Sequence, residues 1–393
     1  MKWEKVKIGE LFQIKHGWAF KGEYFSNEGE LIIVTPGNFY EGGGFRQVGG
    51  KEKFYTGDFP QEFLLKKNDV IIAMTEQGPG LLGSPALVPA DEKYLHNQRI
   101  GLINEIDNTR IDKEFIYRLF YTAIVRNEIF GSATGTKVKH TAPKRIYSIE
   151  VEIPPLPTQR RIASILSAYD DLIENNLKRI KLLEEAINIY YKKLLSIGYK
   201  NFTNEKLNSF VDIISGFPFK SNYYNDNGKH KIVTIKNVQD GFFVPVVTDR
   251  IEDLPDNMNK ALFLSTGDVI MSLTGNVGRV CLVYGDDYVL NQRVVKLSSK
   301  EPIDQSFIYA LVRDKEMLTI LENLSNGTAQ QNLSPIKMGE LLIRYPSSNL
   351  REDFNKKVSP MIEMICKLNI QNTKLREARD ILLPRLMNGE IEV

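Results

Sequence analysis

Gly17-Trp18-Ala19-Phe20-Lys21, near the start of the chain, returns as Gly216-Phe217-Pro218-Phe219-Lys220 in its second half. In the same way Val34-Thr35-Pro36-Gly37-Asn38 returns as Val233-Thr234-Ile235-Lys236-Asn237, and Asn68-Asp69-Val70-Ile71 returns as Gly267-Asp268-Val269-Ile270. Each pair is separated by the same 199 residues, from 17 to 216 in the first. Three matches in one order and at one spacing are not expected by chance, so the chain contains two collinear copies of one unit.

Further matches carry both copies to the same kind of boundary. Thr75 corresponds to Thr274, Asn97-Gln98-Arg99 to Asn291-Gln292-Arg293, Gly135-Thr136 to Gly327-Thr328, and Ile153-Pro154 to Tyr345-Pro346. Within each copy, short runs rich in β-branched residues lie between clusters of Gly, Pro and Asn that predict turns. A proline-marked boundary then leads into a long helical pattern. We therefore predict two similar mixed (α/β, or α+β) domains with small helices at 1–153 and 199–345, and helical segments at 154–198 and 346–393.

The helical segments each carry a seam of mainly apolar residues at alternating spacings of four and three. The first seam is Tyr169, Ile173, Asn176, Ile180, Leu183, Ile187, Tyr190, Leu194 and Ile197, and the second is Met361, Ile365, Leu368, Asn372, Leu375, Arg379, Leu382 and Leu386. Such a seam is typical of a coiled coil. We predict that 158–197 and 349–388 form an antiparallel pair that relates the copies by a pseudo-twofold axis.

Three details qualify the helical prediction. Asn176 and Asn372 each interrupt a seam, and a polar residue there can fix the register of a coiled coil at a cost in stability. Pro360 and Pro384 are expected to kink or end parts of the second helix, because proline lacks a backbone N–H. The alternative to a coiled coil is an amphipathic helix that lies on a globular core.

Composition excludes several classes of protein. A length of 393 residues favours more than one domain, and no run approaches the roughly 18 apolar residues of a membrane span. Cys281 and Cys366 lie far apart without CxxC spacing, which predicts neither a disulfide framework nor a zinc site and suits the cytoplasm. The formal net charge of +2 is too small to identify a nucleic-acid binder by itself.

The sequence lacks a recognisable catalytic or metal-binding motif. The histidines His16, His96, His140 and His230 have no paired metal spacing and do not recur between the copies, which predicts surface or loop positions. The glycine-rich runs at 42–44 and 275–279 lack the context of a phosphate loop and predict turns. Ile153-Pro154-Pro155-Leu156 shares only its prolines with the Asn/Asp-Pro-Pro-aromatic motif of adenine methyltransferases. We therefore expect no catalytic residues and no metal site.

The ordered set of motifs resembles the specificity (S) subunit of type I restriction-modification systems. The resemblance covers essentially the whole chain and rests on the Gly-aromatic-x-Phe-Lys motif, the GDVI-type strand, the Asn-Gln-Arg tripeptide, the stretch from Gly327 to Leu333 and the closing ARDILLPRLMNGEIEV. Copy one departs from the pattern, because it has Lys137, Lys139 and His140 where copy two has Ala329, Gln331 and Asn332.

The resemblance implies a division of labour between several chains. Each domain would be a target-recognition domain that reads one half of a bipartite, asymmetric site in double-stranded DNA. The helices would separate the domains and dock two methyltransferase (modification) subunits, and separate restriction (translocase and endonuclease) subunits would cut DNA. S-adenosylmethionine, ATP and magnesium would bind those partners, with no cofactor and no membrane contact for this chain.

Candidates for DNA contact are polar or cationic residues in the repeated segments. Asn and Gln can bind adenine and Arg can bind guanine in the major groove, whereas Lys and Arg also position phosphates. The candidates are Lys21, Asn38, Thr75, Gln77, Asn97, Gln98, Arg99, Thr136, Lys137, Lys139, His140, Lys220, Lys236, Asn237, Thr274, Asn276, Asn291, Gln292, Arg293, Thr328, Gln330, Gln331 and Asn332.

Structural alternatives remain open for these residues and for the chain. The Asn-Gln-Arg tripeptide could be a turn in which Asn caps backbone groups. Lys21 and Lys220 could be ordinary surface lysines, and core packing is favoured for Trp18, Phe20, Phe217 and Phe219. The chain itself could be a self-contained DNA methyltransferase or nuclease with unrecognised motifs, or a coiled-coil scaffold that binds proteins.

Overall fold

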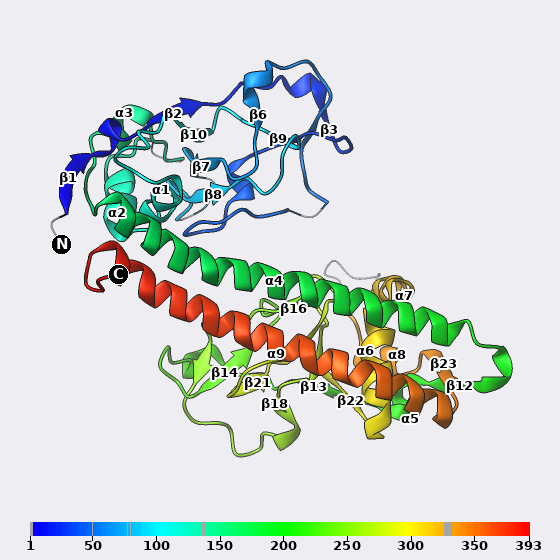
Figure 1. Ribbon diagram of the computed structural model, residues 1–393. Helices are drawn as coiled ribbons and strands as arrows, with labels where there is room; N and C mark the ends of the chain where they lie inside the picture. The colour runs from blue at the N-terminus through cyan, green and yellow to red at the C-terminus, as the bar shows by residue number, and fades with distance from the viewer. Residues whose placement is uncertain (1–2, 49, 77, 79, 136–137, 326–331) are drawn as a thin grey trace. The chain divides into compact units, whose positions relative to one another are not determined.

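The computed structural model describes residues 3–48, 50–76, 78, 80–135, 138–325 and 332–393. The chain forms two compact units, one of Met1–Asp171 with Arg376–Val393 and one of Leu172–Leu375 (Figure 1). Each unit contains one sequence copy. The boundary between the two units crosses both long helices. The four predicted segments instead divide the chain at the ends of those helices, and their separate roles in recognition and spacing stay a prediction.

Among its described residues, unit 1 contains three sheets and three short α-helices, besides short 3-10 turns and parts of two long helices. The sheets have the strand orders β1-β11, β2-β10-β7-β8 and β3-β5-β4-β9-β6. The strands are β1 (Glu4–Lys7), β2 (Gln13–His16), β3 (Phe25–Ser26), β4 (Ile32–Ile33), β5 (Phe54–Tyr55), β6 (Leu64–Leu65), β7 (Val70–Ala73), β8 (Pro85–Leu87), β9 (Tyr94–Leu95), β10 (Ile100–Asn104) and β11 (Glu150–Ile153). The helices are α1 (Lys113–Leu119), α2 (Ala123–Gly131) and α3 (Pro143–Tyr147).

In the described part of unit 2 a similar plan recurs, with four sheets. Their orders are β12-β23, β13-β22-β19-β20, β17-β14-β21-β18 and β15-β16. The strands are β12 (Phe202–Lys206), β13 (Val211–Ser215), β14 (His230–Val233), β15 (Val238–Gln239), β16 (Phe242–Phe243), β17 (Arg250–Ile251), β18 (Phe263–Leu264), β19 (Val269–Ser272), β20 (Val280–Leu282), β21 (Tyr288–Leu290), β22 (Val294–Ser299) and β23 (Leu342–Pro346). The short helices are α5 (Leu207–Phe210), α6 (Gln305–Arg313), α7 (Lys315–Ser325) and α8 (Pro335–Gly339).

The shared strand order confirms that the two copies have one fold. In unit 1 the sheet β2-β10-β7-β8 corresponds to β13-β22-β19-β20 in unit 2, and the β1-β11 ribbon corresponds to β12-β23. The β4–β9 and β14–β21 pairs are both parallel. The mixed α and β content predicted for each domain is therefore correct.

The GDVI-type motif forms the turn into the central buried strand of each copy. Asn68 and Gly267 occupy the same position and have φ angles of 65° and 96°, a left-handed region that favours Gly and tolerates Asn. The next residue closes the turn, because the Asp69 carboxylate accepts a hydrogen bond from the Lys66 N–H at 2.9 Å. Four buried residues follow in both β7 and β19, as expected for β-branched and apolar side chains inside a sheet.

Two long helices, α4 (Leu156–Leu195) and α9 (Ser348–Met387), carry the predicted seams. Every predicted seam residue is buried or half-buried. In unit 2 the Asn176 amide donates to the Asn372 side-chain oxygen at 3.0 Å. In unit 1 Arg379 bonds Asp170 at 2.7 Å. Asn176 follows Asp170 along α4, whereas its partner Asn372 precedes Arg379 along α9, so the pairing is antiparallel.

The seams also pack on the globular cores, as the interpretation of an amphipathic helix on a core expects. The coiled coil itself stays a prediction with which the pairing of the two helices is consistent. In unit 2 Ile187 and Tyr191 of α4 share one core with Phe307 of α6, and the Tyr191 and Phe307 ring centroids are 6.0 Å apart. The proline prediction was wrong in one respect. Helix α9 continues through Pro360 and Pro384 without ending. Next to these prolines Val358 is buried in the core of unit 2 and Leu383 in the core of unit 1, and this packing offsets the lost backbone hydrogen bonds.

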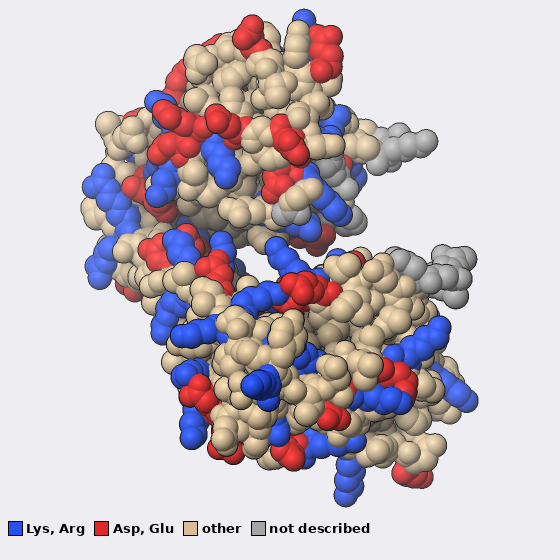
Figure 2. Space-filling model, turned by 90° about the vertical axis from the view of Figure 1, so that its right-hand side faces the viewer, with Lys and Arg blue, Asp and Glu red and all other residues tan. Residues whose placement is uncertain are grey.

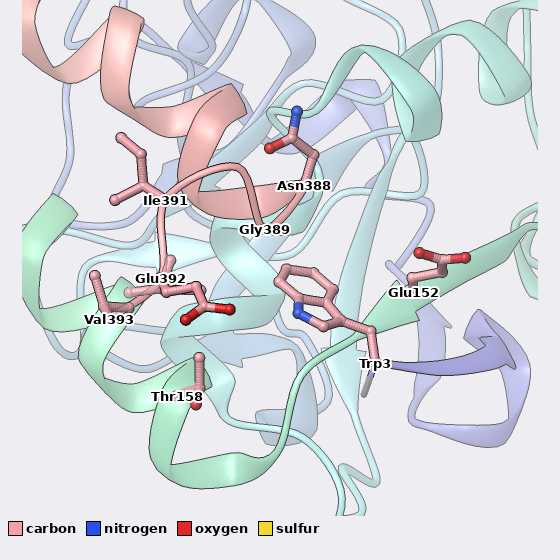
Figure 3. A pocket seen from close by; sticks show the side chains of 9 residues that line it. Trp3, Glu152, Thr158, Asn388, Gly389, Ile391, Glu392 and Val393 are labelled. Carbon is pink, nitrogen blue, oxygen red and sulfur yellow. The ribbon is translucent and has the colours of Figure 1, made fainter. Parts of the chain in front are cut away.

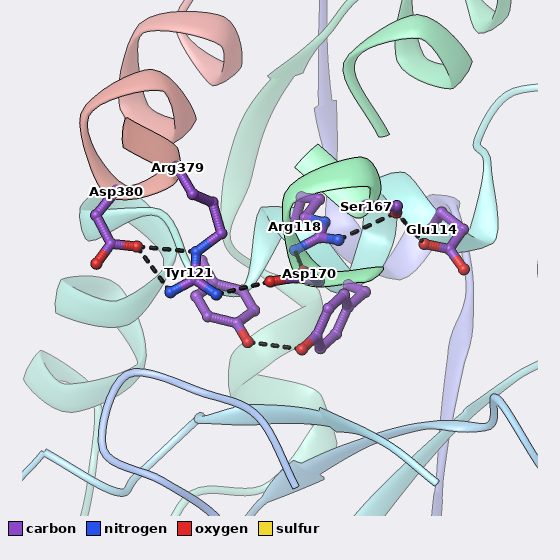
Figure 4. A network of polar contacts seen from close by, with 8 residues as sticks. Glu114, Arg118, Tyr121, Ser167, Asp170, Arg379 and Asp380 are labelled. Carbon is purple, nitrogen blue, oxygen red and sulfur yellow. Dashed lines mark hydrogen bonds and ion pairs between the residues drawn. The ribbon is translucent and has the colours of Figure 1, made fainter. Parts of the chain in front are cut away.

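A partly buried ion network fastens α1 of unit 1 to both long helices (Figure 4). Asp170 of α4 accepts from Arg118 at 2.6 Å and from Arg379 of α9 at 2.7 Å. The Arg118 side chain is buried and also donates to Ser167 at 3.1 Å. One carboxylate thus neutralises two guanidinium groups from different elements, which ties the first domain to the helices.

Candidate nucleic-acid interface

The Gly-aromatic motif and the Asn-Gln-Arg tripeptide lie directly against one another in both units. In unit 1 Trp18 donates its backbone N–H to the His96 carbonyl at 2.8 Å and accepts from the Gln98 N–H at 3.0 Å. Phe217 makes the same two bonds in unit 2, to the Leu290 carbonyl at 2.8 Å and from the Gln292 N–H at 3.1 Å. The repeated motifs are therefore two halves of one structure.

Glycine at the start of the motif allows this close approach. A Cβ atom on Gly17 would lie 2.2 Å from the Asn97 carbonyl oxygen, and one on Gly216 would lie 2.2 Å from that of Asn291. Real Cβ atoms do not come so near a carbonyl oxygen. Only glycine fits at these two positions, because the backbone of the Asn-Gln-Arg turn occupies the space that a Cβ atom would need.

Two more repeated segments join the tripeptide through equivalent hydrogen bonds. In unit 1 the Met74 N–H donates to the Arg99 carbonyl at 3.0 Å, and the Thr141 N–H donates to the Met74 carbonyl at 3.0 Å. In unit 2 the Leu273 N–H donates to the Arg293 carbonyl at 3.0 Å, and the Leu333 N–H donates to the Leu273 carbonyl at 2.9 Å. Motifs scattered along each copy thus meet at the end of the central strand.

Side chains of the tripeptide divide into one that holds the turn and two that face solvent. The Asn97 side-chain oxygen accepts from the Arg99 N–H at 3.2 Å, and Asn291 accepts from the Arg293 N–H at 3.3 Å. The following Gln and Arg are exposed in both copies. Neither Arg side chain has a hydrogen bond or ion pair with the part of the chain that the structure describes. The turn interpretation fits Asn, and the contact interpretation fits Gln and Arg.

We name these regions candidate surface 1 and candidate surface 2. Candidate surface 1 comprises Trp18, Gln98, Arg99, Lys139 and His140, and candidate surface 2 comprises Phe217, Gln292, Arg293, Thr274 and Asn332. The two share a backbone framework in which Gln and Arg recur, whereas Trp18 corresponds to Phe217 and His140 corresponds to Asn332. The counterpart of Lys139 lies outside the described residues. Such a pair could bind two different sequences with one geometry.

Several polar side chains around candidate surface 1 already contact other residues of unit 1. The Thr75 hydroxyl lies 3.1 Å from His140 Nδ1, and the Lys139 ammonium lies over the Phe130 ring, 3.3 Å from its centroid. In candidate surface 2, Thr274 and Asn332 form the equivalent isolated β-bridge. Thr75 is buried, so its role is to position His140. Asn276 is exposed beside Arg279.

The prediction that Asn38 and Asn237 contact DNA was wrong. Both side chains are buried, at 3% and 4% exposure. Asn38 accepts from the Thr35 N–H at 2.8 Å, and Asn237 accepts from the Thr234 N–H at 3.0 Å and donates to the Val244 carbonyl at 3.0 Å. Amides engaged in this way hold loops and have no exposed edge for a base.

Of the remaining candidates for DNA contact, some are exposed and others lie outside the described residues. Lys21, Lys220 and Lys236 are exposed on loops of their units. Six candidates lie outside the described residues: Gln77, Thr136, Lys137, Thr328, Gln330 and Gln331.

Among the motif aromatics and the histidines, two expectations were wrong. Trp18 is 42% exposed although it packs on Phe63 at 5.4 Å between centroids, whereas Phe219 is buried as expected. His96 was expected in a surface loop but is fully buried. Burial lowers the pKa of His96 to about 4, and its Nε2 lies 2.9 Å from the Ile100 carbonyl oxygen.

Charge on the surface is mixed. Lys and Arg alternate with Asp and Glu on the face shown in Figure 2, in keeping with the net charge of +2. Within the described ranges, no three His, Cys, Asp or Glu residues gather closely enough to hold a metal ion. The described helices include none that is long and apolar enough to cross a membrane.

Comparison with known proteins decides the family. A family model described as the type I restriction modification DNA specificity domain matches residues 1–185 and again 199–365. The chain belongs to the type I restriction-modification specificity-subunit family. Each matched range contains one copy and the first part of the long helix after it, so each copy belongs to one specificity domain.

Relatives and a solved structure agree with this membership. The chain is 29% identical to the type I restriction enzyme MjaVIII specificity subunit of Methanocaldococcus jannaschii, covering 100% of this chain and 93% of that protein. It is 27% identical to the MjaIX specificity subunit of the same organism over 75% of this chain and 72% of that protein. The crystal structure of a type I restriction-modification S subunit from M. genitalium matches with a TM-score of 0.62 at 19% identity, covering 98% and 96% of the two chains, and supports the fold.

Some residues of the specificity-domain framework escaped the sequence analysis. Arg118 and Asp170 belong to the partly buried network of unit 1, and in unit 2 Tyr309 bonds Glu184, a carboxyl whose pKa is raised by burial. Their only sequence signal is a polar residue inside an apolar helical pattern. Such a residue does not reveal its partner, because the partner lies on another element.

Proposed function

We propose that the chain is the DNA-reading, non-catalytic subunit of a type I restriction-modification complex, in which each domain reads one half of a bipartite, asymmetric site. The observation that carries the proposal is the repeated framework that exposes a Gln-Arg pair in each unit, Gln98-Arg99 and Gln292-Arg293. Arg suits guanine and phosphate, and Gln suits adenine. Differences between the surfaces, such as Trp18 against Phe217, would make the two half-sites unlike.

We infer the binding partners from the family and from the lack of a recognisable catalytic motif in the sequence. The proposed partners are two methyltransferase subunits docked on α4 and α9, and restriction subunits that cut DNA. S-adenosylmethionine, ATP and magnesium would bind those partners. We infer a location in the cytoplasm, where such a complex would meet DNA. A pseudo-twofold relation between the domains would suit two copies of one methyltransferase.

Reconstitution tests the proposal. The purified chain alone, and the chain with a methyltransferase subunit encoded beside its gene, are incubated with genomic DNA and S-adenosylmethionine, and methylated adenines are mapped. We expect no methyl transfer by the chain alone and methylation at one bipartite sequence by the complex. Methyl transfer by the chain alone would favour the self-contained enzyme. A complex that methylates without sequence preference would favour a scaffold.

A further inference from the structure

The loop that joins β19 to β20 presents one polar side chain, Asn276, at its tip. Gly275 and Gly278 have φ angles of 76° and 78°, the left-handed region in which glycine makes tight turns. Val277, which lies between them in the sequence, is buried in the core of unit 2, whereas Asn276 is exposed. The same loop carries Thr274 of candidate surface 2, so Asn276 adjoins that surface along the chain.

Arg279 holds the Asn276 side chain in one orientation. With its oxygen turned towards Arg279, the Asn276 amide accepts hydrogen bonds from Nη1 and Nη2, both at 3.2 Å. The opposite orientation would place the NH₂ group against the guanidinium, donor against donor. Arg279 Nη1 also donates to the Gln239 side-chain oxygen at 2.6 Å, so the half-buried guanidinium is fixed between the β19–β20 loop and strand β15.

The backbone of Asn276 is held as well. Ser272 is buried, donates its hydroxyl to the Asn276 carbonyl and accepts from the Arg279 N–H at 3.2 Å. These bonds engage the backbone carbonyl and the amide oxygen of Asn276, and they leave its NH₂ group for a ligand. An asparagine without such a clamp can turn its amide and offer either the oxygen or the NH₂ group.

Unit 1 has a serine at the position of Arg279. The Ala73 N–H donates to the Ser84 carbonyl at 3.0 Å in unit 1, and the Ser272 N–H makes the same bond to the Arg279 carbonyl in unit 2. Ser84 is buried and accepts at 3.0 Å from Arg126 of helix α2. The two domains therefore hold this loop differently, as expected of domains that read unlike half-sites.

Two cavities among the described residues are less suited to read a base. The cavity of about 310 Å³ in unit 1 is lined by the carboxylates of Glu152 and Glu392 and by no Lys or Arg among its described lining residues (Figure 3). Carboxylates repel the phosphates of DNA. The cavity of about 500 Å³ in unit 2 has Asp212 as its charged lining residue beside apolar side chains such as Ile336. The exposed β19–β20 loop is the better place for a base contact.

We propose that Arg279 is a positioning residue that makes Asn276 select a keto base, guanine or thymine, at one position of a half-site. This inference rests on the proposed function. In the major groove guanine and thymine present acceptors, whereas adenine and cytosine present an amino donor. The NH₂ group of Asn276 can donate to a keto oxygen but meets an amino group donor against donor. The bidentate pairing of asparagine with adenine needs a free amide oxygen, which Arg279 has taken.

An exchange of donor for acceptor at Asn276 tests the proposal in the complex of the full chain with its methyltransferase subunit. Asn276→Asp keeps the bond to Arg279 but replaces the NH₂ group with a second acceptor. Methylated sites are mapped for the wild type and the variant. We expect one position in one half-site to change from guanine or thymine to adenine or cytosine, with at least about a tenfold change in preference. Asn204→Asp makes the same charge change on exposed strand β12 and should keep the wild-type sequence.

Arg279→Met supplies the second arm. It removes the guanidinium donors but keeps a long unbranched side chain, so the Asn276 amide can turn and the same position should also admit adenine. Unchanged base preference in either folded variant, complete loss of methylation by Asn276→Asp, or changes in both half-sites would overturn the proposal. If circular dichroism shows that Arg279→Met does not fold, the Asn276→Asp map alone decides. Methylation without sequence preference by the wild-type complex would instead overturn the proposed function, and this inference with it.

Discussion

Gly17 is the residue at which the fold of candidate surface 1 is most sensitive. Gly17→Ala places a Cβ 2.2 Å from the Asn97 carbonyl oxygen, and the backbone cannot yield without breaking the bonds between the two motifs. We expect a loss of about 2–4 kcal/mol in the free energy of unfolding of unit 1, measured by urea denaturation. Gly22→Ala is the matched control, since nothing lies within 4 Å of its Cβ position. Equal effects of the two substitutions would refute the close-approach argument.

His96 makes the stability of unit 1 depend on pH. Its pKa is about 4 because of burial, below the value of about 6.5 for an unfolded histidine. The stabilising contribution is therefore complete above pH 6.5 and is lost as the pH falls towards 4, by up to about 3 kcal/mol. The variant His96→Leu copies Leu290 of the second copy and should remove this part of the pH dependence. Urea unfolding at pH 7 and pH 4.5 measures it, and an unchanged slope in the variant would count against a buried neutral His96.

At the scale of residues, the sequence predicted which segments meet at the candidate surfaces. It was less successful in predicting which of their side chains are exposed. The Asn-Gln-Arg tripeptide was found by repetition, but repetition cannot separate the inward Asn97 from the outward Arg99. Asn38 and His96 were misjudged for the same reason. Polarity favours exposure only when no partner is available inside, and partners such as Thr35 and Ile100 become visible only in the fold.

Between the helices, the Asn176–Asn372 hydrogen bond provides a test of pairing in unit 2. Asn176→Leu alone leaves a buried amide without its partner and should cost about 1–3 kcal/mol. The double variant with Asn372→Leu should recover that loss or exceed wild-type stability, because two leucines suit a buried seam. A double-mutant cycle by urea denaturation measures the coupling. Additive losses would mean that the two side chains do not pair.

Helical periodicity was the most reliable part of the sequence analysis at the scale of elements. The observed bounds of α4 and α9 lie within two residues of the predicted 158–197 and 349–388. Periodicity could not show that the seam also serves the globular core, because Ile187 packs equally well on a helix or on α6. Nor could it show that helix α9 passes Pro384, since tertiary packing outweighs a local preference.

Considered as a whole molecule, the chain should keep its two reading domains at a set spacing. One heptad inserted into both α4 and α9 preserves the seam and adds about 10 Å of helix. In a complex with methyltransferase, the spacer between half-sites should lengthen by up to about three base pairs, with some loss of affinity because the DNA grooves also rotate. The bases read within each half should stay the same. Methylation mapping that shows the original spacer at full activity would exclude the helices as the ruler.

The overall architecture was predictable because it is written twice, and two collinear copies predict both a repeated fold and a repeated role. Specificity was not predictable, because under the proposed function it would depend on a few exposed side chains that differ between copies, such as Trp18 and Asn332. The face shown in Figure 2 carries no strong charge signal either, since acidic and basic residues are interspersed on it. The base contacts of the proposed function would therefore depend on the positions of individual side chains, which the sequence does not show.

The central claim is that each domain reads its own half-site, and one comparison tests it most directly. Arg99→Ala and Arg293→Ala are each assembled with the methyltransferase subunit, and methylated sites are mapped across a genome. Each substitution removes one exposed guanidinium and should cost about 1–3 kcal/mol of binding at its own half-site. The account predicts that each variant relaxes specificity in one half, and that the two variants affect opposite halves. Relaxation of both halves by either variant, or of the same half by both, would contradict it.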